Sequence, residues 1–218
     1  MQVFKSKQIA IMIAVISCLG VTTMPEAYAH PHVWVTVKSE VLFDKQKAII
    51  GFRHQWTFDE AYTSFAVDGL DKNNDGTYDR EELKELTEIN ISSLKEFEYF
   101  TYPRLAGQFL KRLPPKNYWL EYHDSKLQLF FTLPLAQPLP IDKIKTFDFA
   151  VYDPSFYVDF ELAKENPVKL TGAPAGCVPG LKKPASELTS QSLFDSDLSA
   201  NDFAEQYATV ISVKCPTS

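Results

Sequence analysis

The sequence is short of sulfur, of histidine and of positive charge. Among its 218 residues are 3 cysteines, 3 methionines and 4 histidines, and 22 Lys and Arg stand against 28 Asp and Glu. The formal net charge of −6 argues against a nucleic-acid-binding surface. The sequence also lacks a Cys-x-x-Cys redox pair, a phosphate-binding loop and a Gly-x-Ser-x-Gly nucleophile elbow. No familiar catalytic constellation is therefore visible, and we assign no catalytic residues.

The remaining composition is that of a folded globular protein. Apolar residues make up 45% of the chain and charged residues 23%, which predicts one sizeable core with little disorder. Aromatic residues are frequent at 13%, and many lie in alternating runs that favour a β-sheet.

The first 29 residues have the pattern of a secretory signal peptide. Lys5 and Lys7 precede the apolar run 9–20, and Ala27-Tyr28-Ala29 is a small-x-small cleavage site. The apolar run is too short to span a bilayer comfortably, which disfavours an uncleaved anchor. Lipoprotein processing at Cys18 is a second alternative, although the preceding residues match a lipobox only loosely. We expect export to the periplasm and cleavage after Ala29.

Cleavage would leave Cys177 and Cys215 as the only cysteines. Two cysteines in an oxidising compartment usually pair, so the sequence predicts a structural disulfide between them.

Residue periodicity predicts an α+β fold. Alternating apolar residues predict strands at 32–43, 48–57, 118–122, 127–133, 146–152, 157–162 and 209–215, and a hairpin within 99–113. Helical spacing predicts helices over 58–70 and 80–97, the first with Thr57 and Glu60 as a capping box, and a short helix from Ser199. We expect 172–184 to form a Gly- and Pro-rich loop.

The expected architecture is a single β-rich domain over 30–218. It is a mostly antiparallel β-sandwich or open barrel with an EF-hand helix-loop-helix inserted at 58–98. Residues 178–198 are expected to be a mobile linker before a C-terminal helix and strand.

The polar loop 71–82 carries the most specific motif in the chain. Calcium prefers six to eight oxygen ligands, and in the EF-hand loop they come from fixed positions. The expected ligands are Asp71, Asn73, Asp75, the Thr77 carbonyl, Asp79 and Glu82. Gly76 permits the sharp bend that the loop needs. A solvated acidic turn is the alternative interpretation.

One residue of this loop departs from the usual pattern. Tyr78 stands where an aliphatic residue usually pairs with a second EF-hand, and the sequence contains no second loop. We therefore expect a single hand that is supported by the β domain. Because calcium outside the cytosol is abundant and fairly constant, a structural role is favoured over a sensor role.

The histidines suggest a second, softer metal. Cleavage after Ala29 would make His30 the N-terminal residue, and its amine and ring together with His32 and His54 could bind Ni²⁺, Co²⁺, Zn²⁺ or Cu²⁺. If the first two strands pair, His32 and His54 share a face but lie about 10 Å apart along it. The alternative is a terminus and one strand histidine without a metal. His123 is expected at a solvated hairpin tip.

Several blocks of the chain together resemble the DUF1007 family. They are His-Pro-His-Val-Trp-Val at 30–35, Trp-Thr-Phe-Asp at 56–59, Phe-Phe-Thr-Leu-Pro at 130–134, Tyr-Asp-Pro-Ser-Phe-Tyr at 152–157 and Gly-Ala-Pro-Ala-Gly-Cys at 172–177, with the acidic loop between the second and third. The resemblance covers nearly the whole mature chain. It implies a periplasmic component of an uncharacterised transport system, associated with nickel/cobalt-type membrane permeases, and it implies no reaction.

Three functions are compatible with these observations. The first is an accessory protein of transition-metal transport, stabilised by calcium and partnered by a membrane metal permease. The second is an envelope binding or structural module whose only metal is calcium. A hydrolase using Asp148, Asp153 or Asp159 is the most remote, because nothing in the sequence marks these carboxylates as a catalytic pair.

Overall fold

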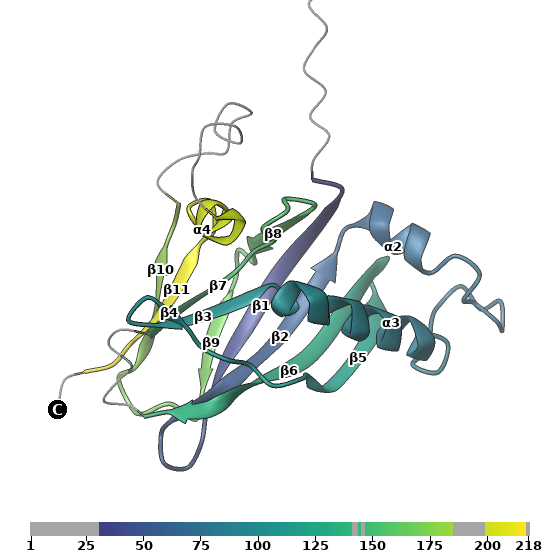
Figure 1. Cartoon of the computed structure of the whole chain (residues 1–218). Helices are drawn as coiled ribbons and strands as arrows, with labels where there is room; N and C mark the ends of the chain where they lie inside the picture. The colour runs from purple at the N-terminus through teal and green to yellow at the C-terminus, as the bar shows by residue number, and fades with distance from the viewer. Residues whose placement is uncertain (1–30, 141–143, 145–146, 185–198, 217–218) are drawn as a thin grey trace, which may run out of the picture.

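The protein folds into two β-sheets that pack face to face, with short helices at two places (Figure 1). The computed structural model describes residues 31–140, 144, 147–184 and 199–216. Among them, no helix is long and apolar enough to cross a membrane.

The first sheet contains most of the predicted strands. Its members are β1 (Val33–Phe43), β2 (Ile49–Phe58), β5 (Lys116–His123), β6 (Lys126–Leu139), β8 (Val158–Leu162) and β9 (Val168–Thr171). The strand order is β5-β6-β2-β1-β8, and β9 pairs with a further part of β1. In β1 the odd-numbered residues are buried and most even-numbered ones exposed, as the alternation of the sequence predicts.

The strands of the second sheet alternate along the chain with those of the first. The second sheet contains β3 (Thr101–Leu105), β4 (Gln108–Phe109), β7 (Phe147–Val151), β10 (Val178–Lys182) and β11 (Val210–Lys214), in the order β10-β11-β7-β3-β4. The predicted hairpin within 99–113 is confirmed as β3 and β4, which pair in antiparallel fashion.

Aromatic side chains join the two sheets. The ring of Phe52 on β2 lies 4.6 Å from Phe149 and 6.3 Å from Phe147, both on β7, measured between ring centroids. All three side chains are almost completely buried. The core between two packed sheets supports the predicted sandwich over the open barrel.

The predicted, mostly antiparallel arrangement is confirmed, although β8 and β9 each pair with β1 in parallel.

One prediction about the strands was wrong, and one strand was missed. Residues 178–182, which were expected to lie in a loop and at the start of a mobile linker, instead form β10. Strand β9 was not predicted. Both missed strands are short, β9 being mostly half-buried and β10 mostly exposed, and neither shows the alternation that marks a strand with one buried face. The remainder of the predicted linker, 185–198, lies outside the described residues.

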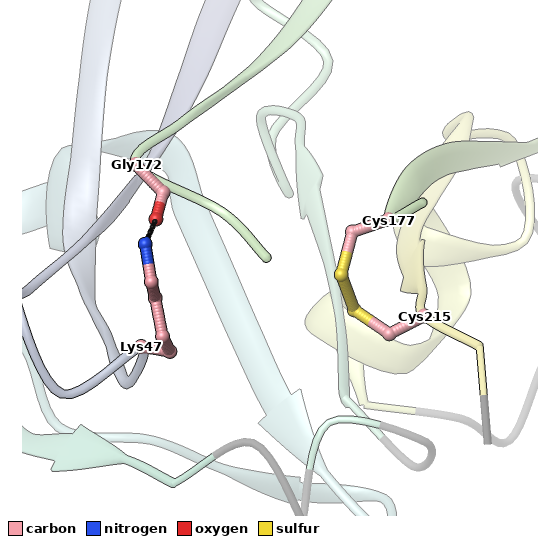
Figure 2. The surroundings of a disulfide bond; sticks show 4 residues. All are labelled: Lys47, Gly172, Cys177 and Cys215. Atoms are coloured by element: carbon pink, nitrogen blue, oxygen red, sulfur yellow. Dashed lines mark hydrogen bonds between the residues drawn. A yellow bond between two sulfur atoms is a disulfide. The ribbon is translucent and has the colours of Figure 1, made fainter. Parts of the chain in front are cut away.

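The predicted disulfide is confirmed. Cys177, just before β10, is bonded to Cys215, just after β11, and so closes the β10–β11 pair at one end (Figure 2). Nearby, the Lys47 ammonium donates a hydrogen bond of 3.0 Å to the carbonyl oxygen of Gly172 (Figure 2). This contact ties the β1–β2 turn to the segment after β9.

The insert after β2 consists of α2 (Glu60–Ala66), a loop and α3 (Lys84–Leu94), followed by the 3-10 helix η1 (Lys95–Phe100). The capping prediction was wrong, because Asp59 and not Thr57 caps α2 by accepting from the Tyr62 amide. Helix α3 packs against β5, and Leu83 and Ile91 join the main core. The insert is thus part of the core and not an appendage.

The C-terminal helix α4 (Ala200–Glu205) begins, as predicted, at a Ser199 cap that accepts from the Asp202 amide. Ala204 and Ala208 pack with Tyr102, Ala150 and Tyr152 in a small second cluster, on the outer face of the second sheet.

Candidate metal centre

The first half of loop 71–82 turns its acidic and amide side chains onto its own backbone. The Asp71 carboxylate accepts from the amides of Asp75 at 3.2 Å and Gly76 at 3.0 Å, and Asn73 accepts from the Asp75 amide at 2.8 Å. Gly76 adopts φ +78°, a left-handed conformation that favours glycine. The bend is therefore formed by the residue that the motif requires.

The second half of the loop follows the same principle. Asp75 accepts from both the amide and the hydroxyl of Thr77 at 2.8 Å, and these bonds lower the pKa of the Asp75 carboxyl. Asp79 accepts from the amides of Glu81 and Glu82 at 2.9 Å. Backbone N–H groups thus hold the carboxylate oxygens of the loop in place.

Glu82 joins the two ends of the loop. Its two carboxylate oxygens accept from the amides of Lys72 at 2.9 Å and Asp79 at 3.1 Å, and the residue is only 8% exposed. Glu81 beside it points outward and lies 3.9 Å from the Lys84 ammonium. Among the described residues, no Lys or Arg forms an ion pair with Glu82, Asp71, Asp75 or Asp79. A buried carboxylate without a counter-ion is costly.

The donor chemistry of the loop fits a hard cation, but its side chains are spread around the bend. In the described part of the chain, no group of three or more His, Cys, Asp or Glu side chains is gathered closely enough to hold a metal ion. Four carboxylates and an amide oxygen within twelve residues are nevertheless the ligands that calcium prefers. A bound cation would have to draw the carboxylates inward from their backbone partners.

The loop is attached to the edge strand of the first sheet. The ring of Tyr78 meets that of Tyr122 on β5 edge to face, with centroids 4.8 Å apart. The Arg80 guanidinium lies 2.6 Å from the Glu121 carboxylate and 5.0 Å from the centroid of Trp119. These contacts give Tyr78 a partner within the β domain. The sequence could not identify the residues of β5, since nothing in their spacing marks them as neighbours of the loop.

The histidines do not converge. Strand register places His54 opposite Ser39, seven residues along β1 from His32, which corresponds to roughly 23 Å. His54 and Trp56 face the core, whereas Trp34 is 50% exposed on the other face. The expectation of a shared face and a separation of about 10 Å was therefore wrong. His32 contacts the ring of Tyr157, and His30 lies outside the described residues.

His54 belongs to the interior of the sandwich. It is completely buried, and desolvation lowers its pKa from 6.5 to about 3. Its Nδ1 lies 2.9 Å from the Ser39 hydroxyl, and its Nε2 lies 3.4 Å from the Thr101 hydroxyl. A neutral imidazole with both nitrogens engaged in the core is a structural residue. His123 is solvated at the β5–β6 turn, 3.1 Å from Asp124.

The three carboxylates considered for hydrolysis lie in different elements. Asp148 is on β7 of the second sheet and Asp159 on β8 of the first. Asp153 lies in the turn between them and accepts from the amides of Ser155 and Val158. No hydrogen bond joins these carboxylates within the described ranges.

Comparison with known proteins places the chain among proteins without an assigned activity. Residues 15–215 match a family described as "Protein of unknown function (DUF1007)". An uncharacterised protein of Haemophilus influenzae is 27% identical over 158 residues, which cover 72% of this chain and 74% of that protein. An "Uncharacterized 15.5 kDa protein in trpE 3'region" of Spirochaeta aurantia is 31% identical over 100 residues, or 46% of this chain and 70% of that protein.

Proposed function

This chain belongs to the DUF1007 family, and we propose that it is an exported protein that binds one calcium ion in a single EF-hand loop, residues 71–82. The proposal rests mainly on one observation. Glu82, the residue that would close the loop, is 8% exposed and has no cationic partner among the described residues. A divalent cation would supply the missing charge and relieve the repulsion among the neighbouring carboxylates.

The residues that would hold the ion are those predicted from the sequence. Asp71, Asn73, Asp75 and Asp79 would provide side-chain oxygens, Thr77 its carbonyl oxygen, and Glu82 both carboxylate oxygens. Leu83 directly follows Glu82 and is completely buried in the main core. Closing the loop around an ion would therefore fix the start of α3 against the sheet. Calcium would stabilise the folded state, because the cation would bind the folded loop and not the unfolded chain.

Export is supported by two features of the chain. Residues 1–29 have the charge, apolar run and cleavage pattern of a leader, and the remaining two cysteines form a disulfide. Disulfides persist in oxidising compartments, such as the bacterial periplasm.

The role in nickel or cobalt transport stays a hypothesis that rests on the family resemblance. Burial of His54 removes one of its three expected ligands, and His32 is exposed just before β1. Any transition-metal site would have to use the amino-terminal residues without His54. An envelope binding module with calcium as its only metal therefore gains weight relative to the metal-transport accessory.

Calcium titration of the exported, disulfide-bonded protein tests the proposal. We expect calorimetry to show one calcium site, and Glu82→Gln to abolish it. Glu81→Gln is the matched control, because it removes the same charge one residue away from a side chain that points to solvent. The control should bind calcium like the wild type.

Three outcomes would count against this function. The proposal fails if the wild type binds no calcium, if Glu82→Gln binds as well as the wild type, or if both variants lose binding equally. The same titrations with Ni²⁺, Co²⁺, Zn²⁺ and Cu²⁺ address the transport hypothesis, for which binding lost in His32→Ala is the expected result.

A further inference from the structure

A cleft opens where the edge strand β8 of the first sheet faces β7 and α4 of the second. Its volume is about 590 Å³. Aromatic rings and carboxylates dominate the lining, which includes Tyr152, Phe156, Phe160, Tyr207, Asp159 and Glu161. None of the described residues that line it is Lys, Arg or His. We propose that this cleft binds an organic cation, an ammonium or guanidinium group carried on an apolar stem.

The aromatic wall is held in place by its own contacts. Phe156 meets Tyr207 and Phe203 nearly perpendicularly, with ring centroids 6.3 Å and 5.8 Å apart. Phe160 packs from the other side against Trp56 and Phe100 in the core. Rings fixed in this way offer their faces and edges to a ligand without losing much freedom when it binds. The faces of aromatic rings attract cations, more strongly when water is excluded.

The carboxylates of the cleft have no positive partner. Asp159 and Glu161 lie two residues apart on β8, and neither forms an ion pair among the described residues. Burial and the neighbouring Glu161 raise the pKa of Asp159. Asp153 also lines the cleft and accepts hydrogen bonds from backbone amides. These amides satisfy its hydrogen bonding but do not neutralise its charge. The described part of the cleft thus carries negative charge without a paired cation.

The described residues favour an organic cation over a bare metal ion. No cluster of three His, Cys, Asp or Glu able to hold a metal is found in the part of the chain that the structure describes. An alkylammonium or guanidinium group, by contrast, can contact a carboxylate and a ring at the same time.

The sequence that follows the lining residue Pro184, residues 185–198, offers no such group. That segment contains Glu187, Asp195 and Asp197 and no Lys or Arg. A ligand from outside therefore matches the charge of the cleft better than this segment does.

The site is tested with n-butylammonium, guanidinium and the uncharged isostere n-butanol. Binding to the exported protein is followed by calorimetry and by shifts of the aromatic NMR signals of Phe156 and Tyr207. We expect both cations to bind in preference to n-butanol, because only they gain from the carboxylates. The Asp159→Asn/Glu161→Gln variant should bind roughly tenfold more weakly.

Control variants separate the site from general charge effects. Asp124→Asn/Glu165→Gln removes two exposed carboxylates elsewhere on the surface and should leave the affinity unchanged. Phe156→Leu should weaken cation binding while the circular dichroism spectrum stays that of the wild type. A parallel titration with Nα-acetyl-lysine amide distinguishes the sources, since tighter binding than n-butylammonium identifies a basic peptide as the natural ligand.

The proposal is overturned if n-butanol binds as well as n-butylammonium. It also fails if neither cation binds, or if Asp159→Asn/Glu161→Gln and its control weaken binding to the same extent.

Discussion

Acidic side chains have different partners in two regions of the molecule. The first region, the β body, consists of the two sheets and α4, and the second is the insert after β2. On the second sheet, Arg104 forms ion pairs with Glu205 and with Asp202, and its guanidinium lies over the ring of Phe109. In the insert, Glu82 is as shielded as any of these groups but has only backbone N–H partners. One region neutralises its charge internally, whereas in the other the described residues provide no cationic partner for Glu82, which is the basis of the proposed calcium site.

The difference distinguishes buried charges that stabilise the fold from buried charges that can bind a ligand. Arg104 and its acids perform an internal structural task, joining α4 to β3, and need nothing from solution. In the loop 71–82 and in the cleft beside β8, the described residues provide no ion pair for Glu82, Asp159 or Glu161. Uncompensated carboxylates held in an ordered environment are therefore better indicators of a ligand than carboxylates in a network.

At neutral pH, the largest effect is expected from breaking the Arg104 network. Arg104→Met should lower the free energy of unfolding by about 3 kcal/mol, because it leaves Glu205 shielded without its counter-ion. Chemical denaturation measures this loss, which should be the same with and without calcium. Arg53→Met, which removes a solvent-exposed pair with Glu40, serves as the control and should cost less than about 1 kcal/mol. Equal losses in the two variants would show that the network contributes no more than a surface pair.

Removal of calcium should have a somewhat smaller effect that is confined to the insert. At a free calcium concentration of about 100 times Kd, binding contributes about 2.7 kcal/mol to folding, so chelation should lower the unfolding temperature by several degrees. Hydrogen exchange should localise the change to α2 and α3. In Glu82→Gln the chelator should have no effect. A uniform loss of protection across both sheets would contradict the distinction between insert and β body.

His54 provides a test of the β body by pH. Its pKa is about 3 in the folded protein and 6.5 as the ordinary value, so between these values the unfolded chain binds a proton that the folded one does not. Its contribution is complete above pH 6.5, and stability should fall below that by up to about 1.4 kcal/mol per pH unit until about pH 3. His54→Gln retains hydrogen-bonding capacity without titration and should flatten the profile. An unchanged profile would mean that other groups cause the acid sensitivity.

Much of the β body was predictable because strands with one buried face carry a period of two. The alternation Val33, Val35, Val37 identified β1, and the disulfide followed from cysteine count and compartment. Strand register was not predictable in the same way. A pairing offset decides which residues of β1 and β2 share a face, and that offset placed His54 in the core and His32 on the outside. The spacing of residues within each strand does not determine the pairing offset between β1 and β2.

In the insert, the local motif was predictable, whereas the contacts with the sheet were not. The proposed ligand positions follow a fixed local spacing, so the sequence alone could suggest them. The residues of β5 that contact the loop could not be predicted. Tyr122 and Trp119 follow the loop by more than thirty residues and belong to no recognisable motif. The acidic cleft was also missed, since it brings β8 together with a helix some forty residues later. Contacts of this kind arise from topology.

The smallest predicted effect tests whether the β body supports the loop in place of a second hand. Tyr122→Leu removes the ring that meets Tyr78, and an aromatic pair contributes about 1 kcal/mol beyond its buried area. If the loop depends on this contact, the calcium Kd should rise roughly fivefold, which calorimetry can resolve. Tyr122→Phe keeps the ring and should bind like the wild type. If Tyr122→Leu also binds like the wild type, the loop is autonomous, and the contact with β5 positions it without affecting its affinity.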